Sequence, residues 1–355
     1  MLKITSNDLI IVEHLENDLI VSYGPYAAYP RAQAILGEKK GKWRIVDENE
    51  KFHKYENQMM MPCSSAQVYE TKGIKKKIVA WIQDDFIRGG AEISSELVMS
   101  IGRDLGYRII QVTPKTQTKI IEQILSISDF AVIGNFWNFN LDQVDVVLKA
   151  FYTDKLPYVK YEHDHRELTR PEFSYKLFRN SVLNIFLSPI HLENHKKSIE
   201  ADGICLPLAI DVDFFHCCDG KLRIPKTALV CNIRNFKRWI ALQKYIDEHP
   251  EIEFHVITNG TPVVSGANVH RIEPVPYEKM PELYCKYEYL VHLLDGWGAG
   301  ERVIFEAALC GCKIVANEWV GHMSWQYDLT DIDGLRDWLR LAPYKFWQEI
   351  YERVG

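Results

Sequence analysis

The sequence lacks any apolar run of the roughly 18–20 residues that a membrane-spanning helix needs. It has no solenoid-type repeat and no low-complexity tract, so repeat and disordered architectures are not expected. An excess of positive charge is also missing, because 42 Lys and Arg stand against 48 Asp and Glu, for a net charge of −6. This balance disfavours binding of duplex DNA through a global basic field, while a local basic patch stays open.

Cysteine pairs with a metal-binding or redox spacing are missing too. Among the eight cysteines only Cys217-Cys218 and Cys310-Gly311-Cys312 lie close together, and neither pair has the CxxC spacing of a zinc knuckle or a thioredoxin site. We therefore expect buried free thiols. Acidic residues also follow closely on the N-terminus, at Glu13 and Glu16, where a signal peptide would not place them. A cytoplasmic location is expected.

What the chain does contain is enough apolar sequence for a large core. Of its 355 residues 47% are hydrophobic and 25% are charged, which is ordinary for a globular protein. At about 150 residues per domain, this length predicts about two domains. Residues 1–73 differ from the rest, because apolar runs at 9–12 and 19–23 flank a polar turn and indicate a hairpin. We expect a small β-rich N-terminal appendage there, with a further strand at 42–46.

Strand-like and helix-like segments alternate from residue 74 onward, and such alternation predicts βαβ units with parallel sheets. We expect an α/β chain with two doubly wound, Rossmann-like domains, residues 74–205 and 206–355, facing each other across a cleft. Open parallel sheets bind ligands at the carboxyl ends of their strands, so this cleft is the expected site. The aromatic residues of the last helix are interpreted as core packing across the two domains: Trp338, Phe346, Trp347 and Tyr351.

The most informative stretch is the glycine-rich segment 295–315, DGWGAGERVIFEAALCGCKIV. A strand precedes it, a helix is expected to start near Glu301, and Gly311 ends that helix before the next strand. Backbone N–H groups at such a loop and helix start can hold phosphate oxygens. Glu306, about one turn into the helix, can accept hydrogen bonds from ribose hydroxyls. The alternative is an ordinary βαβ turn with a solvated Glu306.

This stretch resembles the C-terminal signature of group-1 (family-four-type) GT-B glycosyltransferases: an acidic residue, a Gly-aromatic-Gly loop, Glu-Ala, a glycine and an apolar strand. Four further motifs follow the family's order over residues 75–355. They are Gly89-Gly90-Ala91-Glu92 after the first strand, Pro157–Asp164 with its strand ending in a histidine, Leu206–Phe215 between the domains, and Cys231–Lys237 with its Arg…Lys pair.

The resemblance implies a GT-B-like fold and an enzyme that moves a sugar from a nucleotide-diphosphate-sugar donor, UDP- or GDP-linked, to an acceptor hydroxyl with retention. It implies that residues 206–355 form the donor domain and 74–205 the acceptor side. It implies donor roles for Gly89 and Gly90 (close backbone approach), Arg234 and Lys237 (diphosphate), Gly296, Trp297 and Gly298 (diphosphate and sugar), and Glu306 (ribose). It implies a catalytic role for His163 beside the transferred sugar, with His165 as the rival.

The sequence departs from the family at one acidic position. The family has a Glu eight residues before the helix Glu, and counting back from Glu306 reaches Gly298. We expect Asp295 to take this role as a catalytic residue, after a three-residue insertion; the alternatives are that Glu301 takes it or that the sugar-binding acid is missing. The identity of the donor sugar therefore stays open.

No metal and no cofactor are expected. Asp211-Val212-Asp213 and Asp331-Ile332-Asp333 resemble a metal-binding DxD, but nothing else converges on either. His163 and His165 point to the same face of a strand and lack a third ligand in the sequence pattern.

Other functions and partners remain as alternatives. They are a nucleotide-sugar epimerase of the same fold, a non-catalytic sugar-nucleotide-binding protein, and a viral DNA-base glycosyltransferase. The acceptor is open among glycans, lipid-linked glycans, small molecules and modified nucleic acid. A lysine cluster at 72–77 allows contact with acidic lipid at a membrane surface or with nucleic acid, although a solvated strand entry is preferred.

Overall fold

We analysed a computed structural model of the chain. It describes residues 10–13, 20–23, 77–84, 89–165, 171–216, 223–231, 239–258 and 263–354. The predicted hairpin near the N-terminus is present, because β1 (Ile10–Glu13) pairs antiparallel with β2 (Ile20–Tyr23). The strand predicted at 42–46 lies outside the described residues.

The first large sheet has six parallel strands in the order β4-β3-β5-β6-β7-β8. The strands are β3 (Ile78–Ile82), β4 (Arg108–Val112), β5 (Phe130–Ile133), β6 (Tyr158–Tyr161), β7 (Leu183–Phe186) and β8 (Ile204–Cys205). The helices are α3 (Gly90–Asp104), α4 (Thr118–Ile127), α5 (Leu141–Tyr152), α6 (Pro171–Arg179) and α7 (Pro189–Ile199). Four strands, β3, β5, β6 and β7, are almost wholly buried, as a sheet covered on both faces requires.

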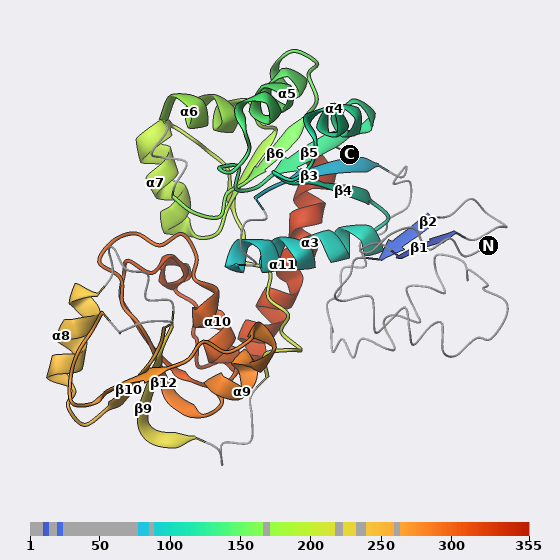
Figure 1. The fold of residues 1–355 in the computed structure, drawn as a ribbon. Helices are drawn as coiled ribbons and strands as arrows, with labels where there is room; N and C mark the ends of the chain where they lie inside the picture. Colours follow the sequence, from blue (N-terminus) through green and yellow to red (C-terminus); the bar gives the residue numbers. More distant parts are fainter. Residues whose placement is uncertain are drawn as a thin grey trace, which may run out of the picture.

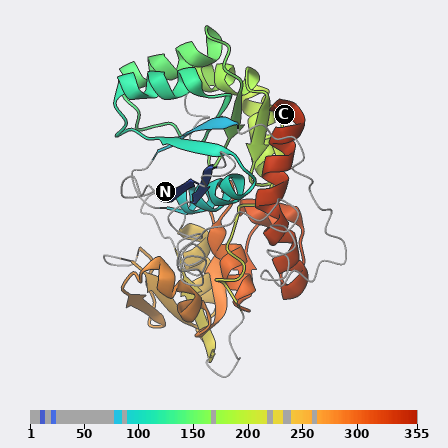
Figure 2. The ribbon, with the colours of Figure 1, turned by 90° about the vertical axis from the view of Figure 1, so that its right-hand side faces the viewer.

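The second sheet has five parallel strands in the order β11-β10-β9-β12-β13. The strands are β9 (Ile224–Val230), β10 (Glu253–Ile257), β11 (Val269–Ile272), β12 (Tyr287–His292) and β13 (Lys313–Ala316). The helices are α8 (Ile240–Glu248), α9 (Met280–Tyr284), α10 (Arg302–Leu309) and α11 (Ile332–Val354), with the 3-10 turns η3 (Tyr277–Lys279) and η4 (Gly321–Trp325). The prediction of two doubly wound parallel sheets is confirmed, and Figures 1 and 2 show the two domains stacked one above the other.

The strand orders define where each sheet can bind a ligand. In the first sheet β4 lies on one side of β3 and the later strands lie on the other, so the switch point of the chain lies between β3 and β5. In the second sheet it lies between β9 and β12. Loops at the carboxyl ends of these strands form the ligand-binding crevice of such sheets. The loops after β9 and β12 contain the Arg…Lys motif and the glycine-rich motif, respectively.

The last helix belongs to both domains. α11 begins in the core of the second domain, where Leu335 and Leu339 are fully buried, and ends in the core of the first (Figures 1 and 2). Pro343 lies between these two halves of the helix. The predicted boundary between residues 205 and 206 separates the two sheets. The second half of α11 nevertheless packs in the core of the first domain, although it belongs to residues 206–355 in sequence.

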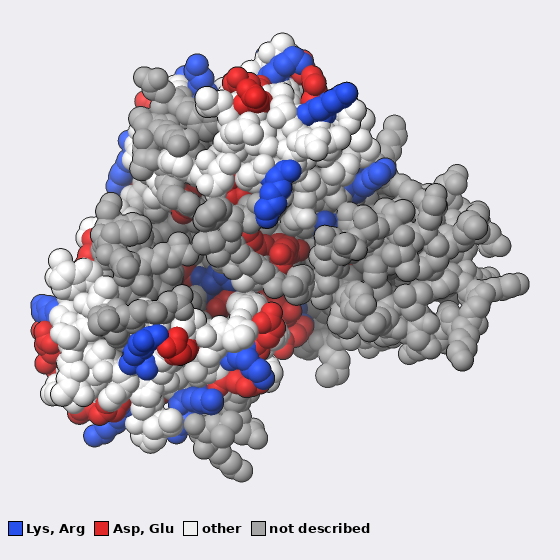
Figure 3. Space-filling view, viewed as in Figure 1, with Lys and Arg blue, Asp and Glu red and all other residues white. Residues whose placement is uncertain are grey.

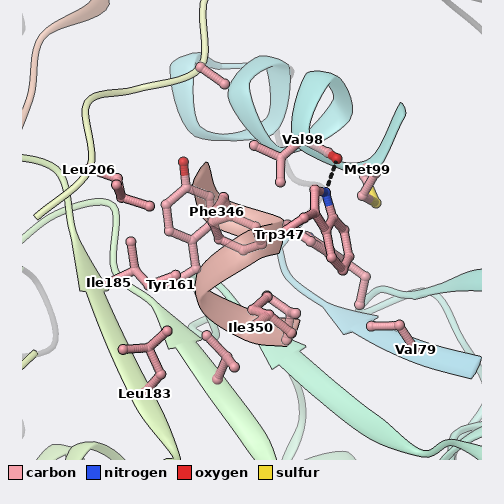
Figure 4. Packing of buried hydrophobic residues seen from close by; sticks show 14 of the residues in the cluster. Val79, Val98, Met99, Tyr161, Leu183, Ile185, Leu206, Phe346, Trp347 and Ile350 are labelled. Carbon is pink, nitrogen blue, oxygen red and sulfur yellow. Dashed lines mark hydrogen bonds between the residues drawn. The ribbon is translucent and has the colours of Figure 1, made fainter. Parts of the chain in front are cut away.

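The anchor of this helix in the first domain is Trp347. Its ring stacks on Tyr107 with centroids 4.4 Å apart, and its indole N–H donates to the carbonyl of Val98 at 2.7 Å (Figure 4). A Cβ on Gly102 would come within 2.2 Å of this ring, so a glycine is required for α3 to approach α11. Packing across the domains is thus confirmed for Trp338, Phe346 and Trp347, but the interpretation was wrong for Tyr351, which is 45% exposed.

The expectation of free thiols holds for four of the described cysteines, Cys205, Cys231, Cys310 and Cys312. It was wrong for Cys285, which is disulfide-bonded. Within the described ranges, none of the helices combines the length and the apolar character that crossing a bilayer demands.

Replacing Trp347 tests whether α11 holds the two domains together. We expect Trp347→Ala to lower the free energy of unfolding by about 3–5 kcal/mol, because the change leaves a cavity and removes the indole's hydrogen bond to the Val98 carbonyl. Tyr351→Ala on the same helix should change it by at most about 0.5 kcal/mol. Urea unfolding followed by circular dichroism measures both, and equal effects of the two changes would contradict this role of Trp347.

Candidate active site

The carboxyl ends of the two sheets meet at the domain boundary, and described residues from both domains are in direct contact there. Ser188, after β7, donates from its hydroxyl to the Ala299 carbonyl at 2.6 Å. The indole of Trp325 in η4 donates to the Leu187 carbonyl at 3.0 Å. Figure 3 shows acidic side chains along the line where the upper and lower domains meet. The sequence-predicted site residues that the structure describes lie on this boundary or next to it.

His163 lies two residues after β6, which ends at Tyr161 and not at the predicted histidine, and is only 7% exposed. Its ring packs on Tyr161, with centroids 4.1 Å apart, and its Nε2 lies 3.5 Å from the Ser95 hydroxyl. Burial, together with the nearby cations of Lys160 and Arg302, lowers the pKa of His163 to about 3, so the ring is neutral at physiological pH. Its Nδ1 is buried and has no hydrogen-bond partner among the described residues. An unpaired buried nitrogen is a feature of a ligand-binding position.

A buried ion pair supports the turn that carries His163. The Lys160 ammonium lies 2.8 Å from the Glu162 carboxylate, and both side chains are fully buried. Lys160 also donates to the Gly134 carbonyl at 2.9 Å, and the backbone N–H of Asp164 donates to Glu162 at 3.1 Å. These bonds tie the end of β6 to the end of β5 and fix the backbone on both sides of His163.

Glu306 lies at the centre of a buried polar network in the second domain. Its Oε1 accepts from Arg302 Nε at 2.9 Å and from the Tyr277 hydroxyl at 3.3 Å. Its Oε2 accepts from the Tyr284 hydroxyl at 3.2 Å. Glu306 is only 3% exposed, so the alternative of a solvated carboxylate is wrong.

Arg302 carries this network across the domain boundary. One of its terminal nitrogens donates to the Ser94 hydroxyl in α3 and to the Ala209 carbonyl at 2.8 Å. Burial alone would lower the pKa of Arg302, but the Glu306 carboxylate and Tyr277 raise it, so the guanidinium stays charged. Arg302 was not among the residues predicted from the sequence. The signal for it was the i,i+4 spacing of Arg302 and Glu306 on one helix face.

Gly90, expected to let the backbone approach a donor, instead packs against this arginine. A Cβ at Gly90 would come within 2.9 Å of Arg302 Cδ. Gly89 is the N-cap of α3, and its N–H donates to the Glu92 carboxylate at 3.0 Å. The close approach therefore joins α3 to α10, and contact of Gly89 and Gly90 with a donor stays a prediction.

The two candidate acids of the glycine-rich loop have different environments. Asp295 accepts from the backbone N–H groups of Ile240 at 2.8 Å and Ala241 at 2.9 Å, so it caps the start of α8. Glu301 is the N-cap of α10, and its Oε2 accepts from the Gly321 N–H at 3.2 Å. Its Oε1 lies 1.6 Å from where a Cβ on Gly298 would be. The Glu301 carboxylate thus fills the space beside Gly298, the position where the family has its acid.

The remaining predicted donor residues surround this loop. Trp297 is 38% exposed and packs on Trp319, with ring centroids 4.3 Å apart. A Cβ at Gly296 would meet nothing within 4 Å, so sterics do not require glycine there. Arg234 and Lys237 lie outside the described residues, in the segment between β9 and α8. This segment begins where β9 ends, and it leads into the start of α8, which Asp295 caps.

A second boundary residue that the sequence did not reveal is His322 in η4. Its Nδ1 donates to the Glu301 carbonyl at 3.0 Å, and its ring stacks on Phe305 with centroids 4.1 Å apart. Burial lowers its pKa to about 3, and its Nε2 has no partner among the described residues. A Cβ at Gly300 would lie 2.7 Å from this nitrogen, so Gly300 leaves the space beside it open.

His165, the rival of His163, lies in a different environment. Its ring is next to His191 and His195 of α7, with centroid distances of 4.7 and 5.5 Å. Asn194 donates to its Nε2 at 3.3 Å. The two histidines that follow β6 therefore lie in different surroundings, His163 beside Ser95 of α3 and His165 beside two histidines of α7.

We expect Glu306→Gln to lower the free energy of unfolding by about 3–5 kcal/mol, because it leaves the buried Arg302 without its counter-charge. Glu193→Gln removes an exposed i,i+4 pair with Lys197 in α7 and should cost at most about 0.5 kcal/mol. Urea unfolding midpoints of the two variants measure the difference. A Glu306→Gln protein as stable as the Glu193→Gln protein would rule out a structural role of the pair.

Comparison with known proteins agrees with this architecture. Residues 236–331 match the family model described as glycosyl transferase-like. No match was found among curated proteins.

Three solved structures share this fold and are distant in sequence. HepE of Anabaena, in complex with UDP and glucose, is 12% identical, with 78% of this chain and 99% of that chain covered and a TM-score of 0.55. A glycosyltransferase from Rickettsia africae is 10% identical, with coverage of 79% and 99% and a TM-score of 0.57. An alpha-glucosyltransferase in complex with UDP and DNA containing an HMU base is 11% identical, with coverage of 79% and 100% and a TM-score of 0.54.

These structures establish the fold, and the family segment covers the region of the glycine-rich loop and α10. Two Rossmann-like domains meet at the carboxyl ends of their sheets, and residues 236–331 form a glycosyl transferase-like segment, so the chain has the GT-B fold, consistent with the group-1 type that its motifs resemble.

Proposed function

We propose that the protein transfers a sugar from a UDP-linked donor to an acceptor hydroxyl at the domain boundary. The observation that carries this proposal is His163, a buried neutral histidine with an unpaired Nδ1 at the carboxyl end of β6. UDP is preferred over GDP because structures of the same fold hold UDP or UDP-glucose. The acceptor stays open, and residues 74–205 are proposed to bind it.

The donor diphosphate is proposed to bind at the switch point of the second sheet. Arg234 and Lys237 follow β9 and would neutralise its charge, which also stabilises the departing nucleotide as negative charge develops. Gly296, Trp297 and Gly298 would line the diphosphate and the sugar from the loop after β12. In this proposal these cations supply the charge stabilisation, and transfer needs no metal ion.

Glu306 is proposed to bind the ribose while it remains paired with Arg302. Two carboxylate oxygens offer about four acceptor positions. Arg302 and Tyr277 use two on Oε1, and Tyr284 uses one on Oε2. One acceptor position on Oε2 is therefore left for a ribose hydroxyl.

For the acid that binds the donor sugar we favour Glu301 over Asp295. Both oxygens of Asp295 accept from the first turn of α8, a role that positions the segment with Arg234 and Lys237. The Glu301 carboxylate lies beside Gly298, where the family carries its acid. The geometry thus supports a replacement of this acid from three residues further along the chain.

Catalysis in this proposal rests on position and charge. The anomeric carbon gains positive character while the diphosphate leaves with negative charge, and retention, which the family resemblance implies, needs no protein nucleophile here. Neutral His163 would orient the transferred sugar through a hydrogen bond, held in place by the Lys160–Glu162 pair beneath it.

A panel of nucleotide sugars tests the proposal. At about 100 times the dissociation constant, the right donor should stabilise the protein by about 2.7 kcal/mol, seen as a raised melting temperature. UDP release in the presence of donor and acceptor then shows transfer. Conversion of donor alone to an isomer would instead show an epimerase, and binding without turnover a non-catalytic protein.

We expect His163→Ala to lower kcat by about 100-fold or more while the nucleotide Kd changes less than about threefold, because His163 contacts the sugar and not the nucleotide. The ring is neutral throughout, so the loss should be the same at about pH 6 and about pH 8. His165→Ala should lower kcat less, because its ring lies outside the donor site, and His249→Ala, at the residue directly after α8, is the control that should leave kcat unchanged. Near-normal turnover of a folded His163→Ala protein would remove His163 from the site.

A second pair of variants separates the two acids. Glu301→Gln should lower kcat by about tenfold or more with the nucleotide Kd nearly unchanged, since its partner is the sugar. Asp295→Asn should weaken UDP binding instead, because it loosens the start of α8. Steady-state kinetics and calorimetry with UDP give both values. A silent Glu301→Gln beside a turnover defect in Asp295→Asn would assign the sugar to Asp295.

A further inference from the structure

Three histidines from two elements form a cluster outside the donor site. His165 follows β6, while His191 and His195 lie one turn apart on the same face of α7. One ring nitrogen from each can be chosen so that the three atoms lie within 4.8 Å of one another. From the sequence, a metal at His163 and His165 was not expected, for want of a third ligand. The signal that this expectation missed is the i,i+4 histidine pair, a metal-binding spacing when it falls on a helix.

The separations of the rings fit a common metal ion. Centroid distances are 4.7 Å for His165–His191, 5.5 Å for His165–His195 and 4.7 Å for His191–His195. Three imidazoles bound tetrahedrally, with metal–nitrogen bonds of about 2.0–2.1 Å, have centroids roughly 5 Å apart. The three rings are therefore spaced as the ligands of one metal ion are, although the nitrogens must come closer than their present separations of up to 4.8 Å.

His195 already has the tautomer that a metal needs. Its Nδ1 donates to the His191 carbonyl at 2.9 Å, so its Nε2 carries a lone pair. That Nε2 is buried and has no hydrogen-bond partner among the described residues. The rings of Phe178 and Phe186 pack beside the His195 ring, with centroids 5.3 and 4.9 Å from the centroid of that ring. An unpaired acceptor in an apolar wall is costly, and a bound metal ion would satisfy it.

His191 is the ligand that must exchange partners. Its Nε2 donates to the Asp164 carbonyl at 3.1 Å, and its Nδ1 accepts from the Leu187 N–H at 3.3 Å. Coordination breaks the first bond and moves the ring proton, or turns the ring over. We therefore expect weaker binding than at a fully preformed site. Lys160 lies on the same side of the sheet, but its charge is balanced by Glu162 at 2.8 Å.

We propose that His165, His191 and His195 bind a divalent transition-metal ion, with Zn²⁺ as the probe of choice, as a three-histidine site with an open fourth position. Imidazole ligands suit Zn²⁺, Cu²⁺ and Ni²⁺ and exclude Mg²⁺ and Ca²⁺, which prefer oxygen. A bound ion would clamp the chain after β6 to α7. His165 is two residues from His163, so this clamp would fix the segment that carries His163.

The test uses the untagged full-length chain, freed of metal by a chelator and titrated with Zn²⁺ in a calorimeter. We expect one equivalent of Zn²⁺ per chain, and with Co²⁺ the strong visible absorption of a tetrahedral complex. His165→Gln and His195→Gln should each weaken Zn²⁺ binding by at least about 100-fold. If His195→Gln does not fold, Zn²⁺ binding by His165→Gln decides the question, because His165 is only half-buried.

A matched control is His249→Gln, at the residue that directly follows α8. Its Nδ1 donates to the carbonyl of Tyr245 four residues before it, at 2.8 Å, as His195 does to His191. This variant should bind Zn²⁺ like the original protein. The proposal is overturned if the original protein shows no saturable binding. It is also overturned if His165→Gln and His195→Gln bind Zn²⁺ with unchanged affinity, because the metal then lies elsewhere.

Discussion

The buried Arg302–Glu306 pair is the interaction on which the rest of the site depends. Arg302 extends from the second domain to Ser94 and to the Ala209 carbonyl, and the charge of Glu306 offsets much of the cost of burying its guanidinium. The same carboxylate is the acid that the family resemblance assigns to the donor ribose. The residue proposed to bind the nucleotide therefore also holds the residue that joins the two domains, so donor binding and domain contact share one network.

Two further features keep the domains in the arrangement that this network requires. α11 passes from one core to the other and is anchored by Trp347 against α3. Glycines at positions 90 and 102 let α3 approach Arg302 and Trp347 closely. α3, which carries Ser94, therefore packs against Arg302 near its first residue and against Trp347 near its last. The pKa of His163, beside Ser95 of this helix, is lowered by burial and by the charges of Lys160 and Arg302, which keeps its ring neutral.

Most of the fold could be predicted from the sequence, because short apolar strands and amphipathic helices repeat regularly and glycine-rich loops end the strands. Contacts between distant residues could not be predicted. Nothing near Asp295 reveals that it caps α8, which begins 55 residues earlier. Nothing near His165 reveals that α7 turns two further histidines toward it. Such pairings depend on the strand order β6-β7 and β9-β12, which periodicity alone does not determine.

The most direct test of the account is an experimental structure of the protein with UDP bound. The account predicts the diphosphate between residues 232–238 and 296–301, and a ribose hydroxyl on Oε2 of Glu306, with the Arg302–Glu306 pair still formed. UDP bound at any other surface, or Arg302 turned away from Glu306 toward the phosphates, would contradict it.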